Sequence, residues 1–550
     1  MFRIETVQDW RGGINNLPRP DLIPPHASML VYDAVVDRVG QLLAREGTRC
    51  FGGAGQLSQG LALYHPPGVE PQLVGVWNQA AYISALNYTW AQGASGVSLV
   101  AGPHAAVVGR DANARWVLYL HSAAASPSDA SFFHSCLVAW HPDSGDFTQY
   151  SYLRPGCAVF WQGRLWAADF AQTDLGRDTI AWSSIWNGGD WSAYRAQNVR
   201  VDPAIGGHIT ALVPARGEEP QLYVFKERAI YIFSVAWATD GWIPSSANDL
   251  DTDRSSIRTL SQQVGCIAPR TAIWVPSAEN NDVFFLAHDG VRSLRRTQDD
   301  VAAGAVGPPL TSGMPDVICR INWAAAHRAV AAVYDNYYLC AVPMDGADHN
   351  THVLVKNLLV GPYEGWTVWR LPVAGFATTG APDPRLFFQC AVATSDTLYG
   401  ATGATLAAAV FEIDEDADAI DPGGSLIQPQ VDTRAFGGDA PGLRKQWRWL
   451  EVEHQAEDTG STLLLFASID MEDTWATLTA FYAAPYNAAI TLPAALPWVF
   501  SRDRVQLHRC GLENINPAYN IAFRLQSNGI GRLRLHRLSV VSAPLGREWQ

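Results

Sequence analysis

The stretch GCAVFWQGRLWAADF, residues 156–170, carries the clearest signal of the fold, because two short apolar runs flank the dipeptide Gln162-Gly163. Apolar, aromatic-rich runs of this length are typical of β-strands, and a polar residue followed by glycine reverses the chain tightly. The stretch therefore predicts a β-hairpin. The same pattern recurs in PQLVGVWNQAAYISAL (71–86), PQLYVFKERAIYIFS (220–234), NDVFFLAHDGVRSL (281–294) and RAVAAVYDNYYLCAVP (328–343). The expected reversals there are Asn78-Gln79, Lys226-Glu227-Arg228, His288-Asp289-Gly290 and Asp335-Asn336.

Hairpins of this kind recur at a spacing of roughly 40–60 residues, which favours a β-propeller built of four-stranded blades. Neither a Gly-His to Trp-Asp repeat nor a kelch repeat is visible, so we expect irregular blades. A row of β-sandwiches stays open as the alternative, because a strand pattern does not report how sheets pack. The predicted fold class is all-β: an irregular β-propeller with an extended N-terminal arm and a C-terminal β-sandwich.

An acidic segment marks the expected end of the propeller. VFEIDEDADAIDPGGS, residues 410–425, is typical of a solvated loop or a domain boundary. Asp414, Asp416 and Asp418 alternate as in a calcium loop, but the glycine and the terminal glutamate of that motif are missing at the required positions. The predicted domains are an N-terminal arm and hairpin (1–55), a β-propeller-like domain (56–410) and a C-terminal β-sandwich module (411–550) that is separate from the propeller.

Composition and charge limit the possible partners. Of the 550 residues, 48% are hydrophobic and only 17% are charged, so we expect partner chains to cover part of the apolar surface. The formal net charge of −14 opposes a role in wrapping nucleic acid. No stretch reaches the roughly 18–20 apolar residues of a membrane span, and MFRIETVQDW (1–10) does not have the pattern of a secretory leader. We expect a soluble protein whose eight scattered cysteines are free, mostly buried thiols in a reducing compartment.

The sequence lacks the fixed spacings that enzymes and metal sites require, such as a glycine-rich phosphate loop, His-Glu-x-x-His or Gly-x-Ser-x-Gly. In HSCLVAWH, His134 and Cys136 share a strand face, but His141 is not expected to converge with them. SIDMEDTW (468–475) matches the Ser-x-Asp-x-Gly-x-x-Trp turn of sialidase-like propellers except at the glycine, and we interpret it as a hairpin turn. We therefore predict no enzyme activity, no cofactor and no metal site.

Three tryptophans, Trp182, Trp186 and Trp191, cluster in IAWSSIWNGGDWSAY. Such a cluster fits a sugar-stacking platform, but aromatic residues also bury large areas in cores and subunit contacts. We favour a core or interface role because the chain is poor in charge.

The N-terminal residues 12–51 contain a Gly-Gly-x-Asn start, a Leu-x-Pro-Pro turn and an Arg-x-Gly ending. These elements are Gly12, Gly13, Asn15, Leu22, Pro24, Pro25, Arg45 and Gly47. Further segments follow in order: DTIAWSSIWNGGDWSAYRAQNVRV, GGHITALVPA, LYVFKERAIYIFS, VGCIAPRTAIWV and VFFLAHDGVRSL. Together they resemble the β-propeller tail nozzle, or tail tubular, proteins of short-tailed bacteriophages. The resemblance covers most of residues 10–300 and extends more weakly to TRAFGGDAPGLRKQWRWLEV.

This resemblance implies a structural virion protein that is assembled in the host cytoplasm and located in the virion tail. Such proteins form rings, typically homohexamers, below a portal and adaptor, and they contact tail fibre, spike or needle proteins. The ring closes and then conducts the channel through which double-stranded DNA passes without specific binding. The resemblance also implies a strand, turn and strand around Arg38 to Gly40, where the residue pattern by itself suggests an amphipathic helix. A secreted carbohydrate-binding or sialidase-like propeller is the alternative.

Two groups of site residues follow from this interpretation. A glycine- and proline-rich segment, residues 9–28, suits an extended arm that crosses to a neighbouring subunit, because proline holds extended geometry and removes a donor. The candidate interface residues are Trp10, Pro18, Pro20, Pro24, Pro25, Trp182, Trp186 and Trp191. An acidic lumen would keep DNA from sticking, and the candidate acidic channel-lining residues, expected in turns or loops, are Asp299, Asp300, Glu412, Asp414, Glu415, Asp416, Asp418 and Asp421.

Overall fold

Strands dominate the computed structural model, which confirms that the chain is mostly β. The helices among the described residues are short: α1 (Leu294–Ala302), α2 (Pro315–Ile318) and the 3₁₀ helix η1 (Ala326–Arg328). No described helix has both the length and the apolar character needed to cross a bilayer. The structure describes residues 2–545 except 55–56, 87–88, 94–98, 100–101, 112, 123–135, 143, 171–174, 192–197, 217–219, 236–255, 277–281, 303–305, 381–383, 392–393, 396–404, 407–408, 415–425, 438–442, 457–461, 472–473, 483–504, 513 and 529–532.

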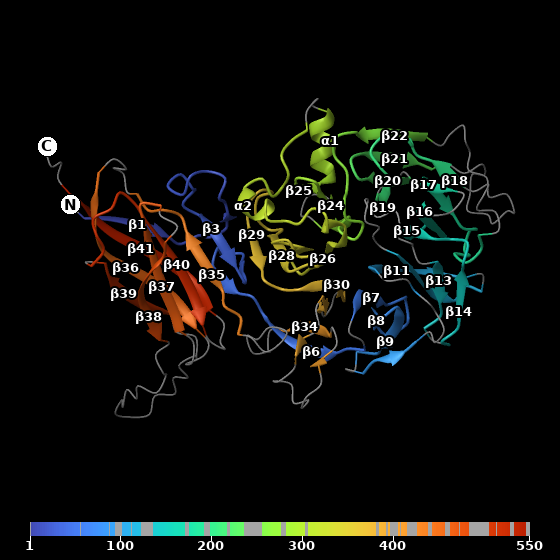
Figure 1. The fold of residues 1–550 in the computed structure, drawn as a ribbon, viewed down its shortest axis with the longest axis horizontal. Coiled ribbons are helices and arrows are strands. Elements are labelled where there is room, and N and C mark those ends of the chain that lie inside the picture. The colour runs from blue at the N-terminus through green and yellow to red at the C-terminus, as the bar shows by residue number, and fades with distance from the viewer. Residues whose placement is uncertain are drawn as a thin grey trace.

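Seven sheets in the described part of the chain surround one axis, as the blades of a β-propeller do (Figure 1). Blade 1 is β7 (Ser58–Tyr64), β8 (Gln72–Trp77), β9 (Ala80–Ser84) and β10 (Ala91–Gln92). Blade 2 is β11 (His104–Arg110), β12 (Trp116–Ser122), β13 (Leu137–Trp140) and β14 (Phe147–Tyr150). Blade 3 is β15 (Pro155–Trp161), β16 (Arg164–Phe170), β17 (Gly176–Trp182) and β18 (Asn198–Arg200). Blade 4 is β19 (Ile209–Pro214), β20 (Gln221–Lys226), β21 (Ile230–Ser234) and β22 (Ser256–Ser261).

The last three blades follow the same plan with changes. Blade 5 is β23 (Ile273–Val275), β24 (Asp282–Ala287) and β25 (Gly290–Ser293). Blade 6 is β26 (Val330–Tyr334), β27 (Tyr337–Val342), β28 (His352–Asn357) and β29 (Trp366–Trp369). Blade 7 is β30 (Val373–Thr378), β31 (Leu386–Cys390), β34 (Val410–Asp414) and the N-terminal strand β6 (Gly47–Gly52), with a small separate hairpin of β32 (Thr394–Ser395) and β33 (Thr405–Leu406).

The predicted hairpin turns are confirmed at all five positions, because each lies between two paired antiparallel strands. Asn78 and Gln79 have φ of 46° and 67°, and Gln162 and Gly163 have φ of 49° and 70°. Positive φ at both central residues is the geometry of the type I′ turn, whose twist matches that of the flanking strands. The residues at each turn therefore determine where the hairpin inside each of these blades reverses.

Hydrophobic clusters join neighbouring blades, and together they hold the ring. Blades 1 and 2 share a cluster that includes Val76 and Trp140, and blades 3 and 4 share one that includes Trp166 and Phe233. Blade 7 meets blade 1 through Phe51 of β6. Because β6 pairs with β34, the N-terminal segment supplies the outer strand that closes the last blade.

A two-layer sandwich lies beside the propeller (Figure 1), and the first 44 residues contribute strands to both layers. One layer is β39 (Gln506–Gly511), β36 (Lys445–Ala456), β41 (Leu533–Pro544), β5 (Leu42–Ala44), β4 (Ala34–Val36) and β1 (Arg3–Val7). The other is β2 (Gly13–Ile14), β3 (Ala27–Tyr32), β35 (Gln430–Thr433), β40 (Ile521–Asn528), β37 (Thr462–Ile469) and β38 (Ala476–Tyr482). The second layer continues from β29 of blade 6, so ten strands form one sheet.

The sandwich is therefore not the separate C-terminal module that the sequence predicts. A single hydrophobic cluster contains Leu450 and Leu525 of the sandwich together with Leu354 and Trp366 of blade 6. The predicted strand, turn and strand around Arg38 to Gly40 is confirmed, because β4 pairs antiparallel with β5.

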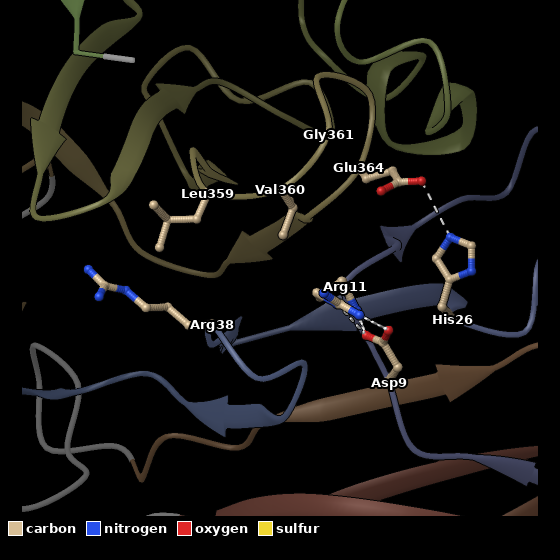
Figure 2. Close-up of a pocket in the computed structure, with 8 residues that line it drawn as sticks. All are labelled: Asp9, Arg11, His26, Arg38, Leu359, Val360, Gly361 and Glu364. Atoms are coloured by element: carbon tan, nitrogen blue, oxygen red, sulfur yellow. Dashed lines mark hydrogen bonds and ion pairs between the residues drawn. The ribbon is translucent and has the colours of Figure 1, made fainter. Parts of the chain in front are cut away.

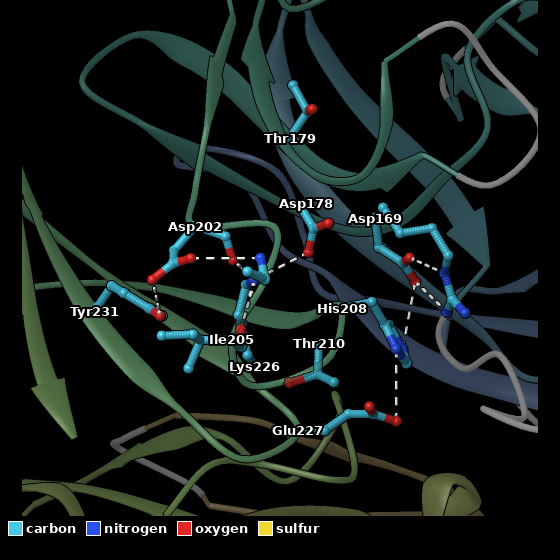
Figure 3. Close-up of polar contacts among 12 residues, drawn as sticks. Asp169, Asp178, Thr179, Asp202, Ile205, His208, Thr210, Lys226, Glu227 and Tyr231 are labelled. Atoms are coloured by element: carbon cyan, nitrogen blue, oxygen red, sulfur yellow. Dashed lines mark hydrogen bonds and ion pairs between the residues drawn. The ribbon is translucent and has the colours of Figure 1, made fainter. Parts of the chain in front are cut away.

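A buried polar network links blades 3 and 4 (Figure 3). The Nζ of Lys226, whose side chain is fully buried, lies 2.9 Å from Oδ1 of Asp178 and donates to the carbonyl oxygens of Asp202 and Ile205. The hydroxyl of Tyr231 donates to Oδ2 of Asp202. Each donor of the ammonium group thus has an acceptor, which is what a buried charge requires.

The other two lysines are buried in the same manner. Lys356 Nζ donates to the carbonyl oxygens of Asn357 and Gly361, and Lys445 Nζ donates to those of Leu443 and Tyr519. All three lysines of the chain therefore serve as internal caps for backbone carbonyls, a task that suits a compact group with three donors.

Lys226→Ala should lower the free energy of unfolding by about 3 kcal/mol, because it leaves the Asp178 carboxylate without its buried partner. The matched control is Arg115→Ala, which removes a half-exposed pair with Asp111 and should cost at most about 1 kcal/mol. Urea denaturation followed by tryptophan fluorescence measures both. Equal losses in the two variants would contradict a special role for the buried pair.

His454 is a titratable group in the sandwich core. Its ring stacks on that of His508, with centroids 5.0 Å apart, and neither ring nitrogen has a hydrogen-bond partner among the described residues. Burial, together with the nearby rings of His508 and His536, lowers the pKa of His454 to about 4. Between pH 6.5 and 4 the unfolded chain therefore binds more protons at this position than the folded chain.

His454→Phe should remove one source of acid sensitivity. As the pH falls from about 7 to 4, the wild-type chain should lose about 3 kcal/mol of stability relative to this variant, and above pH 7 the difference should be constant. Urea denaturation at a series of pH values measures this difference. The exposed control His65→Gln should run parallel to the wild type. A parallel curve for His454→Phe would show that the group does not titrate in this range.

Candidate interaction site at the junction of propeller and sandwich

The glycine- and proline-rich segment, residues 9–28, lies across its own chain. The backbone N–H of Asn16 donates to the carbonyl of Gly313 in the propeller, and that of Ala435 in the sandwich donates to the carbonyl of Pro20. The prediction of an arm that leaves its own fold is therefore wrong. The segment has extended geometry, as expected, but its backbone hydrogen bonds and several of its apolar side chains, among them Trp10 and Ile23, are used inside the chain.

Two glycines of the segment occupy positions that admit no side chain. A Cβ on Gly12 would lie 2.6 Å from the carbonyl oxygen of His26. Gly13 has φ of +62°, and a Cβ there would lie 2.6 Å from the backbone nitrogen of Trp366. Gly13 pairs in parallel with both Trp366 of β29 and Ala27 of β3, so it joins the propeller sheet to the sandwich sheet.

A buried carboxylate lies between β3 and β4, close to the point where the sandwich meets the propeller. Asp33, 2% exposed, accepts hydrogen bonds from Nε of Arg45 at 3.2 Å and from Nε of Arg370 at 2.6 Å. Arg370 also donates through Nη2 to the carbonyl of Gln428 in the sandwich. The carboxylate of Asp33 thus connects three parts of the chain: the N-terminal segment, blade 6 and the start of β35.

Arg45 needs this partner because its guanidinium is fully buried. Burial lowers the pKa of Arg45, and the charge of Asp33 opposes this shift. A buried charge without a partner would be costly, so the ion pair fixes the path of the chain between β5 and β6. Gly47, two residues later, begins the closing strand. The Arg-x-Gly ending of the resemblance therefore coincides with the point where the chain leaves the sandwich and enters the propeller.

A groove of about 740 Å³ lies next to this junction (Figure 2). Arg11 forms a two-point ion pair with Asp9, with Nη2 2.7 Å from Oδ2, and its hydrogen bond to that carboxylate is the main cause of the lowered pKa of Asp9. His26 Nε2 lies 3.4 Å from Oε1 of Glu364. Arg38 also lines the groove.

The groove suits a protein contact more than chemistry. Its other wall is Leu359, Val360 and Gly361, and Leu359 is 48% exposed. Asp9 is paired with Arg11 and Glu364 lies against the ring of His26, and no cysteine or serine nucleophile lines the groove among the described residues. A surface that combines paired charges with exposed aliphatic carbon is typical of the rim of a protein interface.

The predicted interface residues divide into buried and accessible ones. Trp10, Trp182 and Trp191 are at most 2% exposed in the chain's own core, which confirms the core role for Trp182 and Trp191 and contradicts the assignment of all three to a subunit interface. These large rings fill the spaces between sheets. Trp186 is 47% exposed, packed over Gly163 of the predicted turn. Pro18, Pro20 and Pro24 are partly buried and Pro25 is exposed.

The predicted acidic residues do not form one surface. Asp299 and Asp300 lie in α1 and not in the expected turn or loop. Glu412 lies in β34 and not in the expected turn or loop, is 6% exposed and is held at both oxygens by Arg385, which contradicts its assignment as a channel-lining carboxylate. Asp414 ends β34 and pairs with Arg49. Glu415, Asp416, Asp418 and Asp421 lie outside the described residues.

The two fragments weighed for chemistry have local roles. Asp470, with φ of 50°, follows β37 in a turn that leads to β38, and its Oδ1 accepts from the backbone N–H groups of Tyr519 and Asn520. This confirms the interpretation of SIDMEDTW as a hairpin turn. Cys136 is buried, as are most of the eight free cysteines, which confirms the predicted thiols, and His134 lies outside the described residues.

The axis of the propeller holds a cavity of about 370 Å³, lined mainly by small and apolar residues of the inner strands. This is the size of a small-molecule site. A DNA duplex is far wider, so any DNA passage has to lie outside the single chain.

Comparisons with known proteins add little beyond the fold. No protein-family model matches the chain, and no curated protein matches it. A solved β-propeller domain of Cps50 (Swd1) from Myceliophteria thermophila is 9% identical with a TM-score of 0.35, covering 67% of this chain and 98% of that one. A solved exo-β-1,3-galactanase from Phanerochaete chrysosporium, with β-1,3-galactotriose, is 11% identical with a TM-score of 0.26, covering 90% of this chain and 100% of that one.

Gly13→Ala should destabilise the junction by about 3 kcal/mol, because it adds both backbone strain and a clash with Trp366. Gly346→Ala is the matched control: its φ is +78°, but nothing lies within 4 Å of the added Cβ, so only strain of about 1 kcal/mol is expected. Urea denaturation compares the two. If both variants lose the same free energy of unfolding, the added methyl group at position 13 meets no steric obstacle.

Proposed function

We propose that the chain is a structural virion protein: a ring-forming tail nozzle or tail tube component of a short-tailed bacteriophage. In this role it closes and then conducts the DNA channel below the portal and the adaptor. The observation that carries the proposal is the placement of the resemblance residues. Gly12, Gly13 and Arg45 lie at the junction, each at a position with a steric or electrostatic requirement, and Gly47 begins the strand that closes the propeller.

The N-terminal segment also offers surface for subunit contacts. Although Trp10 is buried, Leu17 and Leu22 are each 66% exposed, and they flank Pro18 and Pro20. The two exposed leucines and the Arg19–Asp21 ion pair between them form a mixed apolar and charged surface, and the rigid prolines leave it little conformational entropy to lose. The exposed ring of Trp186 supports a second contact on blade 3. Two such contacts on different sides are what a head-to-tail ring requires.

The charge of the chain fits passage of DNA without binding. A net charge of −14 makes the walls of an assembled ring repel a polyanion, so DNA meets few adhesive barriers. Since the propeller axis is too narrow, the channel in this proposal is the hole between the subunits of a homohexamer. The proposed location is the virion tail, after assembly in the host cytoplasm, with tail fibre, spike or needle proteins as further partners.

The proposed role needs no catalysis. A sialidase-like enzyme is disfavoured because the carboxylate of Asp470 is engaged by two backbone N–H groups that hold the hairpin to the strand beside it. We therefore expect no turnover of glycosides by the purified chain.

The ring is tested by mass photometry and negative-stain imaging of the chain, alone and with its adaptor protein. We expect closed rings. The double substitution Leu17→Glu and Leu22→Glu should weaken assembly at least 100-fold, because each leucine that becomes buried in a subunit contact contributes about 1.5–3 kcal/mol. Phe147→Glu, on the outer strand β14 at the far side of the propeller from the sandwich, is the control (Figure 1).

Circular dichroism of the double variant should match the wild type, because both leucines point to solvent in the single chain. Chains that stay single with the adaptor present would overturn the proposal. Rings that survive the double substitution would remove the Leu17 to Leu22 surface from it.

A further inference from the structure

Trp186 presents its indole ring on blade 3 in a fixed position. Its φ is +54°, a left-handed conformation that a bulky side chain rarely adopts. The backbone N–H of Trp186 donates to the carbonyl of Gly163, and a Cβ on Gly163 would lie 3.0–3.1 Å from three atoms of the indole ring. The ring therefore packs against the glycine of the β15–β16 turn, while 47% of the residue stays exposed.

The loop that carries Trp186 is braced within blade 3 and against blade 2. Oγ of Ser184 donates to Oδ2 of Asp190 at 2.7 Å, and the backbone N–H of Gly188 donates to the carbonyl of Arg110. The guanidinium of Arg110 lies over Trp116, 4.3 Å from the ring centroid, and no carboxylate pairs with it among the described residues. Trp186 and Arg110 together, called the Trp186 knob below, are of the two residue types that are enriched at the energetic centres of protein interfaces.

A groove of about 360 Å³, called the sandwich groove below, lies between the N-terminal segment, α2 and the second layer of the sandwich. Much of its lining is apolar, from Pro18, Pro20, Ile23, Met29, Met471 and Trp475. Two of the five methionines of the chain are among them, and methionine adapts readily to the shape of a partner. Because a cavity of about 150 Å³ can hold a benzene ring, the sandwich groove has room for an indole ring.

One carboxylate in the wall of the sandwich groove has no cation partner among the described residues. Asp432 is held at both oxygens by Arg524, and Arg320 in the same wall is paired with Asp345. Asp316, in the first turn of α2, is exposed and forms no such pair. The sandwich groove thus offers an unpaired negative charge beside apolar lining, where the Trp186 knob offers an unpaired positive charge beside an apolar ring.

We propose that the Trp186 knob of one copy of the chain seats in the sandwich groove of the next copy, with Arg110 against Asp316. This inference rests on the proposed function, because it names the two surfaces that meet in the head-to-tail ring. A ring of this kind joins two different surfaces of each subunit. Blade 3 lies on the far side of the propeller from the sandwich (Figure 1), so the two surfaces of one chain are free to face two different neighbours. The exposed Leu17 and Leu22 flank the prolines of the sandwich groove and extend the contact.

The aromatic part of the contact is tested by mass photometry of the full chain with its adaptor. Trp186→Ala should weaken association between copies at least about 30-fold, because the ring is the central anchor. The matched control is Tyr152→Ala. Tyr152 is also 47% exposed, but it follows β14 at the opposite end of blade 2 from Arg110. This control should assemble as the wild type does.

A charge exchange tests which surfaces meet. Arg110→Glu and Asp316→Arg should each weaken association about tenfold, and the two combined in one chain should restore it to within about threefold of the wild type, because the pair re-forms between neighbours with its signs reversed. Circular dichroism of each variant should match the wild type. If Arg110→Glu does not fold, Trp186→Ala and Asp316→Arg still decide.

The outcomes separate this contact from the ring itself. Rings that form unchanged with Trp186→Ala, or a charge exchange without recovery in a folded chain, would overturn the contact and leave the proposed ring in place. Wild-type chains that stay single beside the adaptor would overturn both.

Discussion

The ion pairs of one buried carboxylate, Asp33, organise the junction on which the rest of the fold depends. Arg45 and Arg370 donate to it from the N-terminal segment and from the end of blade 6. Asp33 itself has φ of 49°, so the chain turns sharply where the carboxylate is held. A buried charge tolerates little displacement, because any movement leaves it without its partners. This cluster sets the direction in which the chain leaves the sandwich to close the propeller.

Closure of the ring and formation of the sandwich are therefore coupled. Strand β6 completes blade 7, and the residues that precede it supply β1 to β5, of which β1, β4 and β5 lie in one layer of the sandwich and β2 and β3 in the other. Gly13 adds a second link, because it pairs with strands from both parts. The propeller is closed by the N-terminal strand β6. Its resistance to opening therefore depends on how firmly β6 is anchored to the rest of the chain. Here the strand is anchored by the whole sandwich, which suits a subunit proposed to form part of the wall of a DNA channel.

The sequence predicts the local features of this fold well and the long-range ones poorly. Turns such as Gln162-Gly163 are encoded by adjacent residues, so all five predicted reversals are found. The sequence predicts a partner contact for Trp10, because a glycine- and proline-rich segment has no periodic core face, yet its ring fills the chain's own core. Asp33 gave no signal either. Its partners are 12 and 337 residues away, and nothing local marks a lone aspartate as buried.

The proposed ring can be observed by cryo-electron microscopy of the chain assembled with its adaptor. We expect a closed ring in which each subunit keeps its propeller and sandwich joined as one body, with the DNA channel between subunits and not along any propeller axis. We also expect the segment of residues 9–28 on its own chain, with Leu17 and Leu22 against a neighbour. A chain that stays single beside the adaptor, or one whose N-terminal segment crosses to another subunit, would contradict this expectation.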